Sequence, residues 1–261
     1  MDDAADVPPG SPGRPAADIP PAGDTGPNRA AAGLDRWRRE LDDAYRGRPR
    51  HPILRRLAPE IARYGLKREY FDLVMEGIAM DLAGRRYATI GELAGYFDRV
   101  AGAVGLLCLQ IFGLHDDPRA REYSRNLSYA LQMTNVIRDM GNDARAGRFY
   151  VPEEDLSASG YSLESLKAGR ADSSFYALGH MEARRAREWF EAARRSLTGD
   201  AKLRRRLAGA EVMRATYEAL LARLDRALDL ALDPVPVRLS LLEKVMTGLA
   251  AYAEARWQVG T

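Results

Sequence analysis

The sequence has one cysteine and no long run of uncharged apolar residues. Cys108 has no partner for an internal disulfide and lies in the apolar stretch 104–112, so we interpret it as a small buried hydrophobe. No stretch reaches the roughly 18 consecutive apolar residues that suggest a membrane-spanning helix. A basic-then-apolar secretory pattern is also absent. These absences predict a cytoplasmic protein without a spanning segment.

The chain also has little net charge of either sign. It carries 39 basic and 37 acidic residues, for a formal net charge of +2. The cations lie among acids, as where Arg38 and Arg39 precede Glu40, which is typical of solvated helix faces. The three histidines occur singly, without the spacing of metal ligands. We therefore expect no nucleic-acid partner and no histidine-bound metal.

The sequence lacks the alternating β-branched pattern that predicts strands. From about Leu34 onward its apolar residues have the spacing of helices instead. Apolar residues recur there at intervals of three and four, and glycine or proline separates the segments. This predicts a single all-α domain over residues 34–261, a bundle of roughly eight or more helices. Residues 7–33 are rich in Pro, Gly, Ala and Asp without apolar periodicity, which predicts a disordered loop.

The segment 129–152 (YALQMTNVIRDMGNDARAGRFYVP) carries the most informative pattern. On a helix, Gln132, Asn135, Asp139 and Asp143 would share an arc of about 80° among large apolar residues. One interpretation is a solvent face. Such faces usually carry Lys, Glu and Arg, however, and this polar stripe has none, which favours the wall of an internal cavity.

Two carboxylates one helical turn apart can hold magnesium, and Asn135 can add an amide oxygen. To clamp a diphosphate and help it leave, such a pair needs a second pair facing it. Residues 1–6 offer Asp2 and Asp6 at the same spacing, with Asp3 beside them. Acidic residues after an initiator methionine are commonly just solvated, so spacing alone leaves both readings open.

Several segments resemble the squalene/phytoene synthase family. Residues 132–152 are similar to its second aspartate motif, Q-L-T-N-I-x-R-D-V-x-E-D-x-x-x-G-R-x-Y-L-P. Residues 96–105 (YFDRVAGAVG) resemble its Y-C-Y-x-V-A-G-x-V-G, and residues 77–82 (GIAMDL) resemble its G-M-x-M-D-L. Asp2, Asp3 and Asp6 match its first motif, D-D-x-x-D. Within the family, these segments more closely resemble the bacterial presqualene diphosphate synthases of hopanoid biosynthesis.

The resemblance implies an isoprenoid synthase fold, a helical bundle around a central apolar cavity. It implies magnesium-dependent, head-to-head (1′-2-3) condensation of two farnesyl diphosphates to presqualene diphosphate, with release of diphosphate, towards squalene and hopanoids. Three magnesium ions would lie between Asp2 and Asp6 on one side and Asn135, Asp139 and Asp143 on the other. The alternatives are a phytoene synthase that takes two geranylgeranyl diphosphates, and a non-catalytic helical scaffold descended from the family.

Further roles follow from the same resemblance. Tyr96 matches a tyrosine near the reacting carbons, although a core tyrosine would look alike. Arg138 suits a structural ion pair slightly better than a phosphate contact, because it points off the stripe. Val100, Ala101, Val104, Leu131 and Met133 suit a dry apolar lining, with ordinary core packing as the alternative. The remaining predicted substrate contacts are Asp3, Gly105, Gln132, Tyr217 and Arg238, with Arg148 and Lys244 as weaker phosphate candidates.

The sequence departs from the family pattern in three places. Asn142 replaces a usual glutamate, and Asp98 replaces a usual aromatic residue or histidine. Two further helices precede the first motif in relatives, so we expect either a start upstream of Met1 or a fragment. Without a G-x-G-x-x-G fingerprint after a strand, we expect no NADPH. The expected partners are isoprenoid diphosphates, with loose association at the inner face of a membrane.

Overall fold

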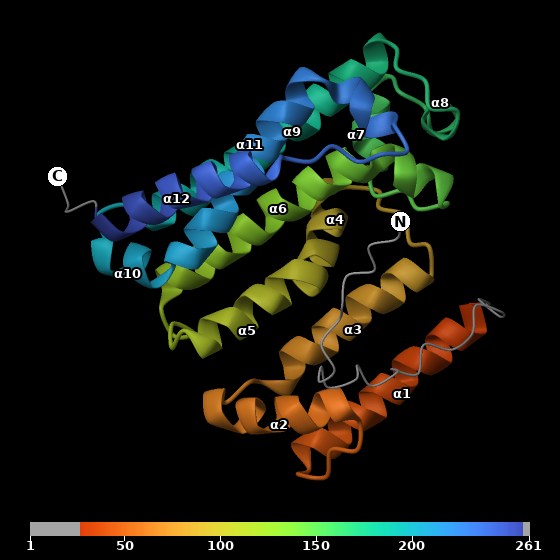
Figure 1. Cartoon of the computed structure of the whole chain (residues 1–261). Coiled ribbons are helices and arrows are strands. Elements are labelled where there is room, and N and C mark those ends of the chain that lie inside the picture. The colour runs from red at the N-terminus through yellow and green to blue at the C-terminus, as the bar shows by residue number, and fades with distance from the viewer. Residues whose placement is uncertain (1–26, 258–261) are drawn as a thin grey trace, which may run out of the picture.

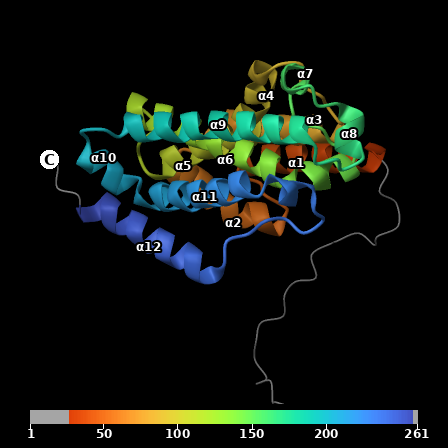
Figure 2. The same cartoon turned by 90° about the horizontal axis from the view of Figure 1, so that it is seen from above.

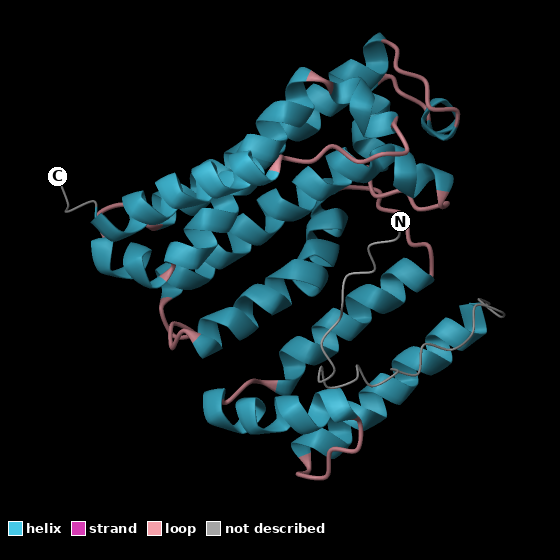
Figure 3. Cartoon of the chain, in the orientation of Figure 1, coloured by secondary structure: helices cyan, strands magenta, loops and turns pink. Residues whose placement is uncertain are grey.

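The computed structural model describes residues 27–257, and every regular element in that part of the chain is a helix (Figures 1 and 3). The structure is 78% helical, which confirms the predicted all-α single-domain fold. Asp2, Asp3 and Asp6 of the predicted first motif lie outside the described residues. None of the described helices is long and apolar enough to cross a bilayer.

In chain order the helices are α1 (Pro27–Tyr45), α2 (Pro52–Tyr64), α3 (Arg68–Leu82), α4 (Ile90–Phe97), the π-helical η1 (Asp98–Gly102), α5 (Ala103–Ile111), α6 (Pro118–Arg145), α7 (Glu153–Ser159), α8 (Leu163–Lys167), α9 (Ser173–Ser196), α10 (Ala201–Arg206), α11 (Ala208–Arg226), the 3₁₀-helical η2 (Leu228–Leu232) and α12 (Leu241–Trp257).

The expected loop over residues 7–33 is wrong for its last part, because α1 already begins at Pro27. Proline suits the first turn of a helix, and the alanines that follow it favour the helical state.

Helix α6 is the central element of the bundle (Figures 1 and 2). Asp117 caps its start, because the Asp117 carboxylate accepts hydrogen bonds from the backbone N–H groups of Arg119 (2.9 Å) and Ala120 (3.1 Å). Pro118 then occupies the first turn, where its missing N–H costs nothing. The helix runs for 28 residues and contacts α5, α9 and α11. Helix α6 therefore packs against three other helices of the bundle.

Helices α1 to α3 form a second, smaller core beside the main one. Leu34, Leu41, Ile61 and Met75 are buried in it. Helix α3 also packs against η1, and Gly77 allows the close approach: a Cβ atom there would lie 2.5 Å from Val100 Cγ1. Because Gly77 lies one turn before Asp81, this contact positions Asp81 next to the bundle.

A second close approach joins α6 to η2. A Cβ atom at Gly141 would lie 2.6–2.8 Å from backbone atoms of Leu232, so no larger residue fits without displacing the main chain. Arg145 secures the same junction, since its guanidinium donates a hydrogen bond to the Leu232 carbonyl at 2.8 Å. The junction therefore fixes the C-terminal half of α6, which carries Asp139 and Asp143.

We predict that Gly141→Ala lowers the free energy of unfolding by about 1–3 kcal/mol, because the methyl group overpacks against backbone that cannot rotate away. Gly33→Ala is the matched control: Gly33 also lies in a helix, but nothing lies within 4 Å of its Cβ position. That control should be neutral or slightly stabilising. Equilibrium denaturant unfolding measures both, and equal midpoints for the two variants would contradict the proposed packing.

Candidate active site

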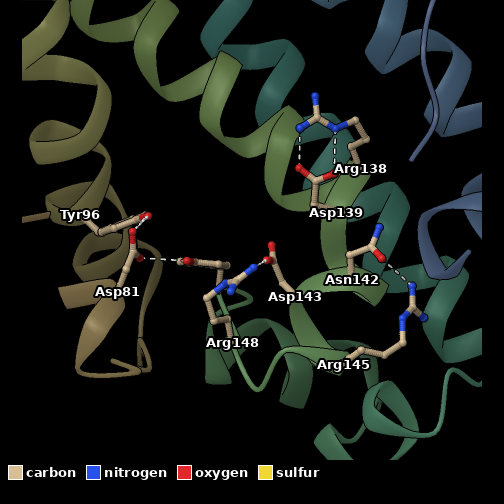
Figure 4. A network of polar contacts seen from close by, with 9 residues as sticks. Asp81, Tyr96, Arg138, Asp139, Asn142, Asp143, Arg145 and Arg148 are labelled. Carbon is tan, nitrogen blue, oxygen red and sulfur yellow. Dashed lines mark hydrogen bonds and ion pairs between the residues drawn. The ribbon is translucent and has the colours of Figure 1, made fainter. Parts of the chain in front are cut away.

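The predicted polar stripe lines a cavity of about 410 Å³, here called the acidic pocket. Its wall comes from α3, α4, α6 and the segment after α6 (Figure 4). The Asp143 side chain is 16% exposed and that of Asp139 is 28% exposed, so neither stands free in bulk solvent. The lining residues are Asp81, Tyr96, Gln132, Asn135, Val136, Arg138, Asp139, Asp143, Arg148 and Tyr150.

Each stripe carboxylate is paired with an arginine. Arg148 donates through Nε (3.1 Å) and Nη2 (2.6 Å) to Oδ1 of Asp143. Arg138 holds Asp139 through both carboxylate oxygens, with Nε 2.8 Å from Oδ1. Burial raises the pKa of Asp143 above its usual value, and the Arg148 guanidinium opposes that rise. The expected ion pair of Arg138 is present, but the expectation that it points away from the stripe is wrong, because its long side chain reaches back to Asp139.

Asn135 contributes an oxygen that has no partner. Its Oδ1 atom is buried and accepts no hydrogen bond from the described residues. An unpaired buried oxygen costs about 1–3 kcal/mol, so such atoms commonly indicate a missing ligand. Asn135 is one of the residues that line the acidic pocket, together with the two aspartates. Carboxylate and amide oxygens are the donors that magnesium prefers, so the pocket fits this ion chemically.

The described residues supply only part of a metal site. Within residues 27–257, no group of three or more His, Cys, Asp or Glu side chains is arranged to hold a metal ion. Asp139, Asp143 and Asn135 would therefore need further oxygen ligands. Substrate phosphates and water commonly complete magnesium sites. The carboxylates of residues 2–6, which lie outside the described residues, are the other predicted source.

Sequence reasoning did not assign Asp81 and Tyr150 to the site. The Tyr96 and Tyr150 hydroxyls donate hydrogen bonds to the two oxygens of Asp81, at 3.0 and 2.8 Å. Their rings stack with centroids 5.4 Å apart. Burial, and then the charge of Asp81, raise the pKa of Tyr96, so its hydroxyl keeps its proton. The signal for both residues was present, because they lie in the segments 77–82 and 132–152 that match the family.

An apolar cavity of about 400 Å³ adjoins the acidic pocket, and the two share Gln132 and Asn135. It runs between α5, α6 and α11. Val100, Ala101, Val104 and Leu131, which the sequence suggested as an apolar lining, line it, and so does Gly105, a predicted substrate contact. Met133 does not line it. This side chain is fully buried in the main core, because its position on α6 turns it away from the cavity.

A third cavity, the basic pocket, has a volume of about 280 Å³. It shares Arg138 with the acidic pocket and Tyr217 with the apolar cavity. Arg238 and Lys244 line it as well, and none of the residues within 27–257 that line it carries a carboxylate. The predicted phosphate-binding candidates Arg138, Tyr217 and Arg238 are thus brought together, and Lys244 joins them.

The two departures from the family pattern lie outside these cavities. Asn142 accepts a hydrogen bond from Arg145 at 2.9 Å and does not line the acidic pocket. Asp98 accepts a hydrogen bond from the Tyr129 hydroxyl at 2.7 Å and lies 3.7 Å from the Arg125 guanidinium. Both residues therefore support helix packing near the site without facing it.

A family model and the similar curated proteins point to the same family. Residues 14–243 match the model of the family described as squalene/phytoene synthase. The chain is 36% identical over 172 residues to phytoene synthase 1 of Arabidopsis thaliana, covering 63% of this chain and 40% of that protein. It is 36% identical over 177 residues to 15-cis-phytoene synthase of Synechococcus elongatus, covering 64% and 58%. The chain thus spans about half the length of these curated relatives.

Solved structures of a squalene synthase and a dehydrosqualene synthase have folds similar to that of this chain. The crystal structure of squalene synthase HpnC from Alicyclobacillus acidocaldarius superposes with a TM-score of 0.69 at 34% identity, covering 76% of this chain and 74% of that one. A dehydrosqualene synthase in complex with a ligand gives a TM-score of 0.75 at 26% identity, covering 87% and 79%. These similarities confirm the resemblance predicted from the sequence motifs.

We predict that replacing both stripe carboxylates, Asp139→Asn with Asp143→Asn, weakens divalent-cation binding by at least about tenfold, since even outer partners of a metal site contribute 10–100-fold. Electron paramagnetic resonance of Mn²⁺, titrated in the presence of inorganic diphosphate, measures the change. Asp116→Asn is the control, because this aspartate is 91% exposed and lies outside the acidic pocket. Equal affinities for the double variant and the wild type would contradict a cation site here.

Proposed function

The chain belongs to the squalene/phytoene synthase family, and on that premise we propose that it joins two prenyl diphosphates head to head and releases diphosphate. One observation supports the proposal most directly: the acidic pocket adjoins the apolar cavity, and both are lined by Gln132 and Asn135. A prenyl diphosphate has the same two parts, a charged head and an apolar tail. The basic pocket beside them suits the head group of a second substrate.

The residues that would hold magnesium are Asn135, Asp139 and Asp143, together with Asp2 and Asp6. When bound, magnesium neutralises charge on the diphosphate and so favours its departure as an anion. The arginines beside the carboxylates can add to this effect, because a planar guanidinium binds phosphate oxygens through two hydrogen bonds. Arg138 and Arg148 already lie in the acidic pocket. The pocket therefore combines ligands for a metal cation with arginines that can donate hydrogen bonds to phosphate oxygens.

The allylic cation that diphosphate departure creates would lie in the apolar cavity, where its contact with water is limited. The cavity walls present aliphatic side chains such as Val100, Val104 and Leu131, which offer the cation no nucleophile. The 2,3-double bond of the second substrate then attacks the cation, which forms one carbon–carbon bond. Loss of a proton closes a cyclopropane, and the released diphosphate accepts that proton. Tyr96, held by Asp81, can position the diphosphate or relay the proton.

We further propose that both substrates are farnesyl diphosphate and that the product is presqualene diphosphate, a precursor of squalene and hopanoids, formed without NADPH. Asn135 and Ser124 both line the apolar cavity and are eleven residues apart on α6, about 17 Å along the helix axis. Three isoprene units of four carbon–carbon bonds each extend about 15 Å, from bond lengths near 1.5 Å. A farnesyl tail therefore matches the cavity length.

A second candidate is phytoene synthesis from two geranylgeranyl diphosphates. The similarity to the Arabidopsis and Synechococcus phytoene synthases favours it. One structural feature agrees: Phe112, at the far end of the apolar cavity, is 42% exposed, so the end of the cavity is not sealed by buried side chains. A fourth isoprene unit would extend past this ring.

The test is to incubate the full chain with magnesium and either labelled farnesyl or labelled geranylgeranyl diphosphate, without NADPH, and to identify the lipids by mass spectrometry. We expect presqualene diphosphate from farnesyl diphosphate. Asp139→Asn with Asp143→Asn should reduce turnover by at least about 100-fold, since two carboxylates that would hold the magnesium assisting diphosphate departure are lost. Asp116→Asn should retain activity. Phytoene from geranylgeranyl diphosphate would correct the chain length, and no product from either substrate would favour a non-catalytic scaffold.

A further inference from the structure

Helix α12 has two unlike faces. Its inner face is made of small residues, Gly248, Ala251 and Ala255, and packs on α11, where a Cβ atom at Gly248 would lie 3.2 Å from Val212 Cγ1. Its outer face carries large apolar side chains that are 43–79% exposed. They are Leu241, Leu242, Val245, Met246, Leu249 and Tyr252.

This outer face is one continuous stripe. At 100° per residue, its six members fall within an arc of about 140°, so they point to the same side of α12. Single exposed apolar residues are ordinary on protein surfaces, but a row of six along one helix marks a site of interaction. Nothing in the described part of the chain covers the stripe, and Figure 2 shows α12 at the edge of the bundle.

The stripe lies next to an open side of the apolar cavity. Met213 follows Val212, the residue that contacts Gly248 of α12, and Met213 lines the cavity while remaining 45% exposed. Val104 and Phe112 on the α5 side of the cavity are likewise more than 40% exposed. Apolar surface thus extends from the cavity across α11 towards α12. A partner that covers α12 would lie beside the opening.

Cations flank the C-terminal end of the stripe. Helix α10 contacts α12 (Figures 1 and 2). Its side chains Lys202, Arg205 and Arg206 are exposed to solvent. Arg256 of α12 is also exposed and lies over the Tyr252 ring, 5.8 Å from its centroid. Glu254 is the exposed acid on this part of α12. An apolar helical face bordered by Lys and Arg is the pattern that binds anionic lipid surfaces.

We propose that the outer face of α12 docks the protein on an anionic lipid bilayer, with the helix lying in the plane of the interface. The apolar side chains enter the acyl boundary, and the cations of α10 contact lipid phosphates. The open side of the apolar cavity then faces lipid. This part of the inference rests on the proposed function. In this arrangement prenyl tails enter the cavity from the membrane, and the apolar product returns to the membrane without crossing water.

The test measures co-sedimentation of the full chain with phosphatidylcholine vesicles that contain or lack phosphatidylglycerol. We expect binding to the anionic vesicles, weakened at least about tenfold by Leu242→Glu with Met246→Glu, which is a loss of about 1.4 kcal/mol. The matched control is Ile53→Glu with Tyr176→Glu, which places two glutamates at exposed apolar positions of α2 and α9. Lys202→Gln with Arg205→Gln should reduce the preference for anionic lipid.

Circular dichroism checks that each variant remains helical. Binding lost equally in the control and the α12 variant, or no binding by the wild type, would overturn the proposal. A concentration-dependent dimer that the α12 variant abolishes, without vesicle binding, would assign the stripe to a second copy of the chain. Product formation in detergent micelles separates the two proposals: an α12 variant that keeps this activity but no longer binds vesicles supports docking through α12.

Discussion

Carboxylates placed beside an apolar cavity need cationic or hydrogen-bonding partners, and this constraint organises the centre of the molecule. Asp143 and Asp139 are held by Arg148 and Arg138, and Asp81 by two tyrosine hydroxyls. Without such partners, burial would favour protonation of the carboxyl groups. Each pair holds its carboxylate in the wall of the acidic pocket. In a site built in this way, a carboxylate can exchange its arginine for a metal cation, and the released arginine can then bind a phosphate.

The backbone fixes this arrangement through close contacts rather than through long side chains. Gly77 brings α3 against η1, and Gly141 brings α6 against η2. The first contact carries Asp81 towards Tyr96, and the second holds the end of α6 that presents Asp139 and Asp143. Interiors packed at crystal-like density resist displacement, so these contacts limit how far the acidic side chains can separate. The polar site therefore depends on residues that contribute no polar atom themselves.

The sequence predicted the face of α6 correctly, because helical periodicity alone places Gln132, Asn135, Asp139 and Asp143 on one side. The sequence alone does not predict which helix faces this side of α6, because that depends on tertiary packing. The place of Asp81 in the pocket therefore emerges only from the fold, although its segment 77–82 resembles a family motif. Periodicity also misjudged Arg138 and Met133. A long arginine side chain can turn back towards its own stripe, and a methionine next to a polar stripe can still face the core. The start of α1 differs from the prediction because proline and alanine occur both in loops and in the first turns of helices.

Helix α12 is a second case in which periodicity does not predict tertiary packing. Its sequence has the apolar spacing of an ordinary packed helix, and periodicity cannot tell whether a neighbour covers the apolar face. Only the fold shows that small residues pack inward and that the large ones remain exposed. This inversion of the usual order, with large apolar side chains outward, costs solvation free energy in water. It is expected where the working environment is not water alone, and an enzyme for long apolar tails would work in such an environment.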